Sequence, residues 1–198
     1  RCDECPLGPN GALQKDEWRP VVGEFHPGAK ILALGEAPRA EDIMQGRPLM
    51  GSAAGEWARF LATAGLNRSH VDLDNVIACK PSGKEGGAWN RMEKSLDRLN
   101  KKRVSQGKDP LPHPIDCCRP RLDNVLGKYD KFIALGKTAT RVLSGQSGSI
   151  RSLRGGPMYI DDDWLWSLKP TSKKMLATFS PHYVTRAPNW RPVIEADI

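Results

Sequence analysis

The cysteines are the residues whose spacing most directly suggests chemistry. The chain has five: Cys2 and Cys5 form a C-x-x-C pair, Cys79 stands alone, and Cys117 and Cys118 are adjacent. They are too few and too scattered for a disulfide framework. Because two adjacent cysteines do not easily serve one site together, the odd count fits four ligands and one spare. Four thiolates would hold zinc or an iron–sulfur cluster, and spacing alone does not decide between them.

Polar side chains beside glycine or proline form a second set of candidates. They occur where short apolar runs end, in the segments GEAP at 35–38, CKP at 79–81, GK at 136–137 and SPHY at 180–183. Open parallel sheets bind their ligands in the crevice beyond the carboxyl ends of the strands. We therefore expect these segments to converge on one site.

The apolar runs themselves predict the elements that position the site. Four of them, at 31–34, 76–79, 132–135 and 175–179, are typical of strands buried on both faces. Helical patterns at 53–64, 119–126 and 138–143 follow the first three, which indicates βαβ units. The predicted fold class is α/β, a three-layer α/β/α domain with a central, mainly parallel four-stranded sheet.

Three further segments depart from this pattern. Residues 82–90 are rich in glycine and predict a loop, residues 91–109 predict a charged, solvated helix, and residues 158–166 predict an irregular hairpin. No linker interrupts the chain, so we expect a single domain over residues 1–198.

Composition and charge bound the class of protein. The chain has 198 residues, of which 39% are hydrophobic and 27% charged, as in soluble globular proteins. No apolar run approaches the roughly 20 residues that span a bilayer, and no signal peptide is visible, so we expect a cytoplasmic protein without membrane contact. The net charge of +7 favours a polyanionic partner such as nucleic acid, although a merely basic soluble protein would look the same.

Six segments, in order, resemble the family 4 uracil-DNA glycosylases. The longest is GEAPRAEDIMQGRPLMGSAAGEW at 35–57, where the family reads approximately G-E-A-P-G-x-x-E-D-x-x-G-x-P-F-V-G-x-A-G. The others are DNVIACKP at 74–81, CRPRL at 118–122, KFIALGKTAT at 131–140, IRSLRG at 150–155 and TFSPHYV at 178–184. The family reads T-Y-H-P-A-Y-L at the last of these. The ordered set covers nearly the whole chain and is far more specific than any single piece.

The resemblance implies a [4Fe–4S] cluster on four of the cysteines. Its ligands would be Cys2, Cys5, Cys79 and Cys118, the last preferred over Cys117 because Arg119, Pro120 and Leu122 align with the family motif. We expect Cys79 to end a strand and Cys118 to open a helix. The cluster's expected role is to pin the N-terminal loop to the sheet.

The resemblance also implies the reaction and its residues. Such enzymes flip a nucleotide out of DNA and hydrolyse its N-glycosidic bond. Gly35 and Glu36 fall in the water-presenting loop, with Ala37 and Leu49 at the base, and Asn75 is expected to hydrogen-bond the base edge with its amide. A strand-end cap is the alternative role for Asn75. The expected DNA-backbone contacts are Arg154, Tyr183 and Arg186.

Two departures from the family concern the base. Leu49 stands where the family has a stacking phenylalanine, and Ser180 stands where it has a histidine that donates to the departing base. His182 lies two positions later. Loss of such a donor costs on the order of 3 kcal/mol. Either His182 takes over, Ser180 donates more weakly, the base is not uracil, or the chain does not catalyse.

A third departure is a basic insertion at about 82–113. It lies between Cys79 and Cys118, which are separated by 38 residues, more than in the family. Its lysines and arginines would extend phosphate contacts or read a modified base. Trp89 within it would either wedge into the duplex or pack its own loop, and packing is favoured.

The functional prediction is a monomeric DNA glycosylase that removes uracil or a modified base and leaves an abasic site. Glu36, His182 and Ser180 are the predicted catalytic residues. One alternative is a non-catalytic module of the same fold that binds DNA or a modified base. Another is a protein-interaction module, which would bind DNA weakly and with little dependence on salt.

Overall fold

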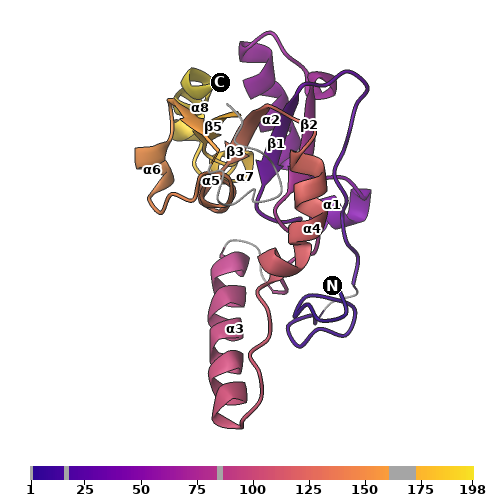
Figure 1. The fold of residues 1–198 in the computed structure, drawn as a ribbon. Coiled ribbons are helices and arrows are strands. Elements are labelled where there is room, and N and C mark those ends of the chain that lie inside the picture. The colour runs from indigo at the N-terminus through magenta and orange to yellow at the C-terminus, as the bar shows by residue number, and fades with distance from the viewer. Residues whose placement is uncertain (1, 16–17, 84–86, 161–172) are drawn as a thin grey trace.

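A twisted, mainly parallel sheet runs through the middle of the molecule (Figure 1). The structure is a computed structural model, and it describes residues 2–15, 18–83, 87–160 and 173–198. The strands are β1 (Ile31–Gly35), β2 (Val71–Asn75), β3 (Lys131–Leu135), β4 (Pro157–Tyr159) and β5 (Lys174–Thr178). Their order across the sheet is β2-β1-β3-β5-β4. Strands β2, β1, β3 and β5 are parallel, and β4 pairs antiparallel with β5.

Helices connect the strands and cover the sheet. They are α1 (Ala40–Gln45), α2 (Ser52–Thr63), α3 (Ala88–Ser105), α4 (Pro114–Leu126), α5 (Lys137–Ser144), α6 (Ile150–Leu153), α7 (Pro181–Val184) and α8 (Arg191–Asp197). Short 3₁₀ turns lie at Arg68–His70 and Pro188–Trp190. Among the described residues, no helix combines the length and apolar character needed to cross a bilayer.

Alternate strand residues form two cores, because successive side chains point to opposite faces of a sheet. On one face, Leu32, Leu34 and Phe132 pack with α4 and α5. On the other, Ala33 and Ile133 pack with α2, α7 and α8. Helices therefore lie on both faces, and the three-layer α/β/α prediction is confirmed. The sheet has five strands instead of four because the short edge strand β4 joins it.

The second strand lies five residues earlier than predicted. Residues 76–79 are buried but not part of a strand, and Cys79 therefore follows β2 in a loop instead of ending it. The strand itself contains two buried aspartates that look like surface residues in the sequence. The Tyr129 hydroxyl donates to Asp72, and Arg121 pairs with Asp74 at 2.5 Å, which satisfies both carboxylates.

The helix predicted at 119–126 begins at Pro114. His113 caps it, its Nδ1 accepting the Ile115 amide at 3.2 Å, and proline suits the first helical position. Cys118 consequently lies inside α4 and does not open it. The helices predicted at 53–64 and 138–143 are α2 and α5, each within one residue of the predicted ends. Part of the predicted hairpin at 158–166 lies outside the described residues, and β4 covers its beginning.

The basic insertion contains α3, which projects from the sheet and its covering helices (Figure 1). The helix spans 88–105 instead of the predicted 91–109. The last three residues of the loop predicted at 82–90 therefore belong to the helix. Trp89 is 5% exposed and packs near His113, with ring centroids 6.1 Å apart. The packing interpretation of Trp89 is confirmed, and the wedge is wrong because its ring is not available to DNA.

Candidate active site

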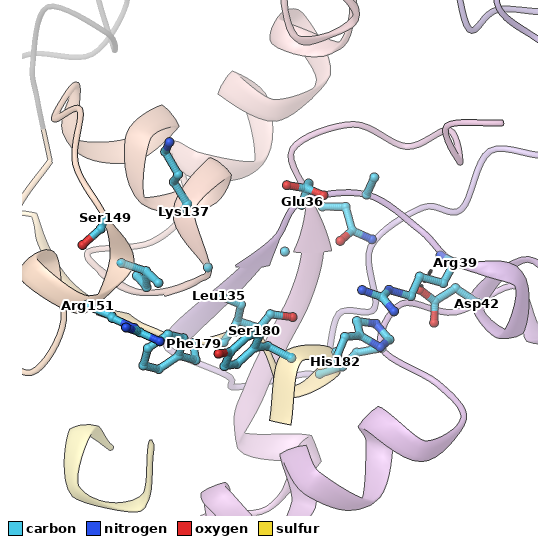
Figure 2. A pocket seen from close by; sticks show the side chains of 17 residues that line it. Glu36, Arg39, Asp42, Leu135, Lys137, Ser149, Arg151, Phe179, Ser180 and His182 are labelled. Atoms are coloured by element: carbon cyan, nitrogen blue, oxygen red, sulfur yellow. Dashed lines mark hydrogen bonds between the residues drawn. The ribbon is translucent and has the colours of Figure 1, made fainter. Parts of the chain in front are cut away.

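A cavity of about 460 Å³ opens at the carboxyl edge of the sheet, between the ends of β1, β2, β3 and β5 (Figure 2). Every residue predicted to act in catalysis or base binding lines it. These residues are Gly35, Glu36, Ala37, Leu49, Asn75, Ser180 and His182, together with Tyr183 from the predicted DNA-binding set. Parallel strands bring them together from three separated parts of the chain. Their individual roles stay predictions.

Glu36 follows β1 directly and is held by a hydrogen bond from α5. The Thr138 hydroxyl, in the first turn of α5, donates to Glu36 Oε2 at 2.5 Å. Burial raises the pKa of the Glu36 carboxyl, while the Thr138 hydrogen bond and the charge of Arg39 partly oppose that rise. The carboxyl is therefore poised for proton transfer nearer to neutral pH than an exposed glutamate.

Asn75 ends β2 with its backbone tied down. Its carbonyl accepts from Arg121 at 2.6 Å, and its amide donates to Asp74 at 2.7 Å. Its side-chain Oδ1 lies against Gly35, where an added Cβ would come within 2.4 Å of it. Glycine at position 35 thus gives the Asn75 amide its place on the cavity wall.

Leu49 projects into the cavity from a strained loop. Its φ is +56°, in the left-handed region that β-carbon-bearing residues seldom adopt. Arg68 holds the loop by donating to the carbonyls of Leu49 at 3.1 Å and Pro48 at 2.6 Å. Arg68 also pairs with Glu24 at 2.7 Å. Although burial raises it, hydrogen bonds from Arg68 and Arg47 bring the pKa of Glu24 down to about 2, so this anchor stays charged.

His182 lies in α7, two residues after Ser180. Burial, followed by the charges of Arg39 and Arg186, lowers the pKa of His182 to about 3. The ring is consequently neutral at physiological pH and can donate one N–H while carrying no charge. Ser180 precedes α7 and faces the same cavity (Figure 2).

Three further residues contribute to the site that sequence reasoning did not select. Arg39 lines the cavity from the N-terminus of α1, Phe179 lines it from the end of β5, and Thr138 holds Glu36. Phe179 stacks on Tyr183 with centroids 5.2 Å apart. The departure of Arg39 from the family's glycine was the available signal for that residue. For Thr138 there was none, because it lies 102 residues from Glu36.

The structure separates the three residues predicted to contact DNA. Tyr183 lines the main cavity, and Arg186 lines a smaller neighbouring cavity that also contains His182. Arg154 instead pairs with Asp197, its Nε at 2.8 Å from Oδ2, and donates to the Val193 carbonyl at 3.0 Å. These contacts favour a structural role for Arg154, and its DNA contact stays a prediction.

The cysteines gather beside this site, where the N-terminal loop meets α4 and the loop after β2. Burial raises the pKa of Cys5, and it raises that of Cys79 to about 11. The charges of Cys2 and Cys118 act on both thiols in the same direction. Cys117 also reaches Cys5 with its side chain. In the described part of the chain, no three His, Cys, Asp or Glu side chains form a group that could hold a single metal ion.

Comparison with known proteins identifies the family to which the chain belongs. The model of the uracil DNA glycosylase superfamily matches residues 22–195. The chain belongs to this superfamily. The type-4 uracil-DNA glycosylase of Thermotoga maritima is 29% identical over 189 residues, covering 94% of this chain and 79% of that protein. The type-4 uracil-DNA glycosylase of Sulfurisphaera tokodaii is 26% identical over 186 residues, covering 89% of this chain and 70% of that protein.

Membership of the superfamily confirms the resemblance read from the six segments. It also confirms the class of the protein as a DNA glycosylase, a hydrolase of N-glycosyl bonds. Which base fits the cavity, and which atoms act on it, depend on the residues that differ from the family.

Proposed function

We propose that this protein hydrolyses the N-glycosidic bond of uracil, or of a related modified base, flipped out of DNA, and leaves an abasic site. One observation supports this above the others: the water-presenting, base-reading and donor residues all line a single cavity. The positive charge of the chain suits a DNA partner. A single 198-residue domain acting as a monomer remains part of this proposal.

In the proposed reaction, the bond between the sugar C1′ and the base nitrogen breaks, and its electron pair leaves with the base. The sugar passes through an oxocarbenium-like state, and a water oxygen then bonds to C1′. Glu36 accepts a proton from that water. Neutral His182, or Ser180, donates a hydrogen bond to the base oxygen that gains charge, and Asn75 binds the base edge.

The aromatic platform for the base also differs from the family. Leu49 offers apolar contact without a π face, whereas Phe179 provides an aromatic ring on the same cavity. Phe179 is 4% exposed and braced by Tyr183 and Trp190, so its position is fixed. Base contact through Phe179 accounts for a functional pocket in which position 49 is aliphatic.

An excision assay tests the proposal. Oligonucleotides with uracil, hydroxymethyluracil or glycosylated cytosine, single- and double-stranded, are incubated with the protein and cleaved at abasic sites with alkali. We expect strand breaks at uracil or a modified base. Glu36→Gln should reduce the rate by about 10²–10⁴-fold. Glu195→Gln, a carboxyl that pairs with Arg59 away from the cavity, should excise normally.

The non-catalytic alternative predicts a different result in the same assay. Tight binding to DNA without strand breaks on any of these substrates would reject the glycosylase proposal in favour of a base-binding module. Weak DNA binding with little dependence on salt would favour the protein-interaction module instead.

We further propose that Cys2, Cys5, Cys79 and Cys118 hold a [4Fe–4S] cluster with a structural role. The donor set fits, since burial and the neighbouring thiols Cys2 and Cys118 raise the pKa of Cys5 and Cys79, and such thiols become thiolates readily only beside positive metal. Within the described residues, the buried Trp18 Nε1–H has no acceptor in hydrogen-bond geometry, yet it faces Cys79 closely enough to lower the pKa of that thiol. Such a donor suits a thiolate ligand.

The loop that carries the first two cysteines is tightly wound. The Cys5 amide donates to the Cys2 carbonyl at 3.2 Å, and the Gly8 amide donates to the Cys5 carbonyl at 2.8 Å. A Cβ at Gly8 would stand 1.8 Å from the Cys2 carbonyl oxygen, so only glycine permits this turn. Bound metal would tie the loop to α4 and to the segment after β2, and thereby stabilise the protein.

A further inference from the structure

We infer that Arg39 stabilises the negative charge that develops on the departing base, a task assigned in the family to the histidine that this chain lacks. The inference rests on the proposed glycosylase function and names an additional catalytic residue for it. Arg39 stands where the family motif has glycine, so neither the family pattern nor the sequence reading gives it a role.

The position of Arg39 places its charge beside the reacting groups. Its side chain is half-buried and lines the main cavity as well as two smaller neighbours. Figure 2 shows its side chain extending above His182 with the guanidinium turned toward the cavity. The charge of Arg39 lowers the pKa of both Glu36 and His182, which means that it lies within electrostatic reach of both groups.

Hydrogen bonds from backbone amides to Asp42 fix the start of α1 at Arg39. The Arg39 amide donates to Asp42 Oδ2 at 3.0 Å, and the Met50 amide donates to Asp42 Oδ1 at 2.7 Å. Asp42 is 1% exposed and joins the start of α1 to the loop that carries Leu49. Substitution of the Arg39 side chain leaves these two hydrogen bonds in place, and Arg39→Lys also keeps the positive charge that favours the Asp42 carboxylate.

Two other cations line the same cavity but are less suited to this task. Lys137 is exposed at the start of α5. Arg151 lies over the Trp190 ring, 4.8 Å from its centroid. Since His182 is neutral, Arg39 is the cation of the cavity lining whose charge acts on both Glu36 and His182.

This arrangement divides the task between two side chains. His182 supplies a neutral hydrogen-bond donor, and Arg39 supplies a charge that no accessible pH removes. The electron pair of the broken bond leaves with the base, and Arg39 keeps its proton throughout. It acts by electrostatic attraction, which is strong in a partly buried site.

Leaving-group dependence tests the inference. Excision of uracil is compared with that of 5-fluorouracil, which departs as a more stable anion and needs less help. Arg39→Ala should slow excision of uracil by on the order of 100-fold or more. Its effect on 5-fluorouracil should be several times smaller. Arg39→Lys, which keeps the charge, should recover much of the loss.

Arg186→Ala is the matched control, because it removes an arginine from the adjoining cavity. As a loss of a phosphate contact, it should affect both bases by the same factor. Equal losses for Arg39→Ala on the two bases would overturn the inference and indicate that Arg39 contacts the DNA backbone.

A binding measurement separates this inference from the proposed function. Free 5-fluorouracil is titrated into the protein bound to abasic-site DNA, over a pH range in which the base ionises. The wild-type protein should bind the base more tightly as it becomes an anion, and Arg39→Ala should lose that gain. If wild-type affinity does not rise with ionisation, the inference fails, whether or not the protein excises uracil.

Discussion

The Thr138 hydroxyl donates a hydrogen bond to the Glu36 carboxylate and thereby joins the start of α5 to the loop after β1. The charge of Glu93 in α3 raises the pKa of Glu36, and the charge of Arg141 in α5 lowers it. The two are themselves paired, 3.6 Å apart. The protonation of Glu36 thus depends on α3 and α5, two helices that are distant from it in the sequence.

Removal of the Thr138 hydroxyl should change the pH dependence of excision. The hydrogen bond favours the carboxylate, so Thr138→Val should raise the pKa of Glu36 further. A general base is active above its pKa, and the acidic limb of the rate profile should therefore move to higher pH. A hydrogen bond to a charged group contributes about 1.5–3 kcal/mol, which corresponds to tenfold or more in rate on that limb. Thr138→Ser should behave as wild type. If the acidic limb of Thr138→Val does not move, the Thr138 hydrogen bond has no part in catalysis.

His182 should make the protein less stable in acid. The native ring, with a pKa of about 3, excludes the proton that the unfolded chain binds below its ordinary value near 6.5. The unfolded state then binds more protons, so the free energy of unfolding falls as pH drops through this window, by up to roughly 1.4 kcal/mol per pH unit. Urea unfolding of wild type and His182→Gln between these pH values measures the difference. Parallel pH profiles would show that His182 is accessible to protons in the native state.

His182→Ala examines the donor itself. If His182 replaces the family histidine, excision of uracil should slow by on the order of 10²–10³-fold. Single-turnover rates with saturating enzyme isolate the chemical step from DNA binding. Rates equal to wild type would remove His182 from the mechanism and leave Ser180 and Arg39 as the groups facing the base.

The adjacent cysteines provide a test of cluster ligation. Cys79→Ser and Cys118→Ser should lose visible colour and iron, and both should unfold at lower temperature, because metal binding to native ligands stabilises the fold. Cys117→Ser should keep its colour. Since Cys117 also reaches Cys5, the reverse pattern would make Cys117 the ligand. A colourless, well-folded wild type that contains zinc would reject the iron–sulfur cluster.

Alanine substitution of Arg154 should lower the stability of the protein, whereas alanine substitution of Arg186 should lower the salt dependence of DNA binding. Arg154→Ala leaves the buried carboxylate of Asp197 without its guanidinium but still bonded to the Thr178 hydroxyl, and loss of this charged partner costs about 1–3 kcal/mol of stability. Its DNA affinity should keep the wild-type dependence on salt. Arg186→Ala should leave stability unchanged and reduce the slope of log affinity against log salt by about 1. A reduced slope for Arg154→Ala would restore its predicted contact with DNA.

Sequence reasoning located the site better than it located the elements around it. The residues of the cavity were predictable because they lie in short motifs at the ends of apolar runs, and such runs indicate parallel strands. The position of β2 was not predictable, since the partners of the buried Asp72 and Asp74 carboxylates, which include His26, Tyr129 and Arg121, lie far from them in the sequence. Local patterns do not record partners of that kind.

The same limitation applies to chemistry at the site. The loss of the family histidine was visible in the sequence, but the group that compensates for it was not. Arg39 could be linked to His182 only after folding had brought the two residues to the same cavity. The low pKa of His182 likewise depends on burial and on two arginines, which no spacing along the chain reveals.

The left-handed backbone at Leu49 carries strain that the burial of its side chain offsets. A non-glycine residue in this conformation typically stores about 1–3 kcal/mol, which glycine would release. Leu49 is also 7% exposed and belongs to the core beside α2, and loss of a buried leucine side chain costs about 2–5 kcal/mol, so Leu49→Gly should not raise the melting temperature. Selection for heat tolerance would therefore keep the leucine, strain included.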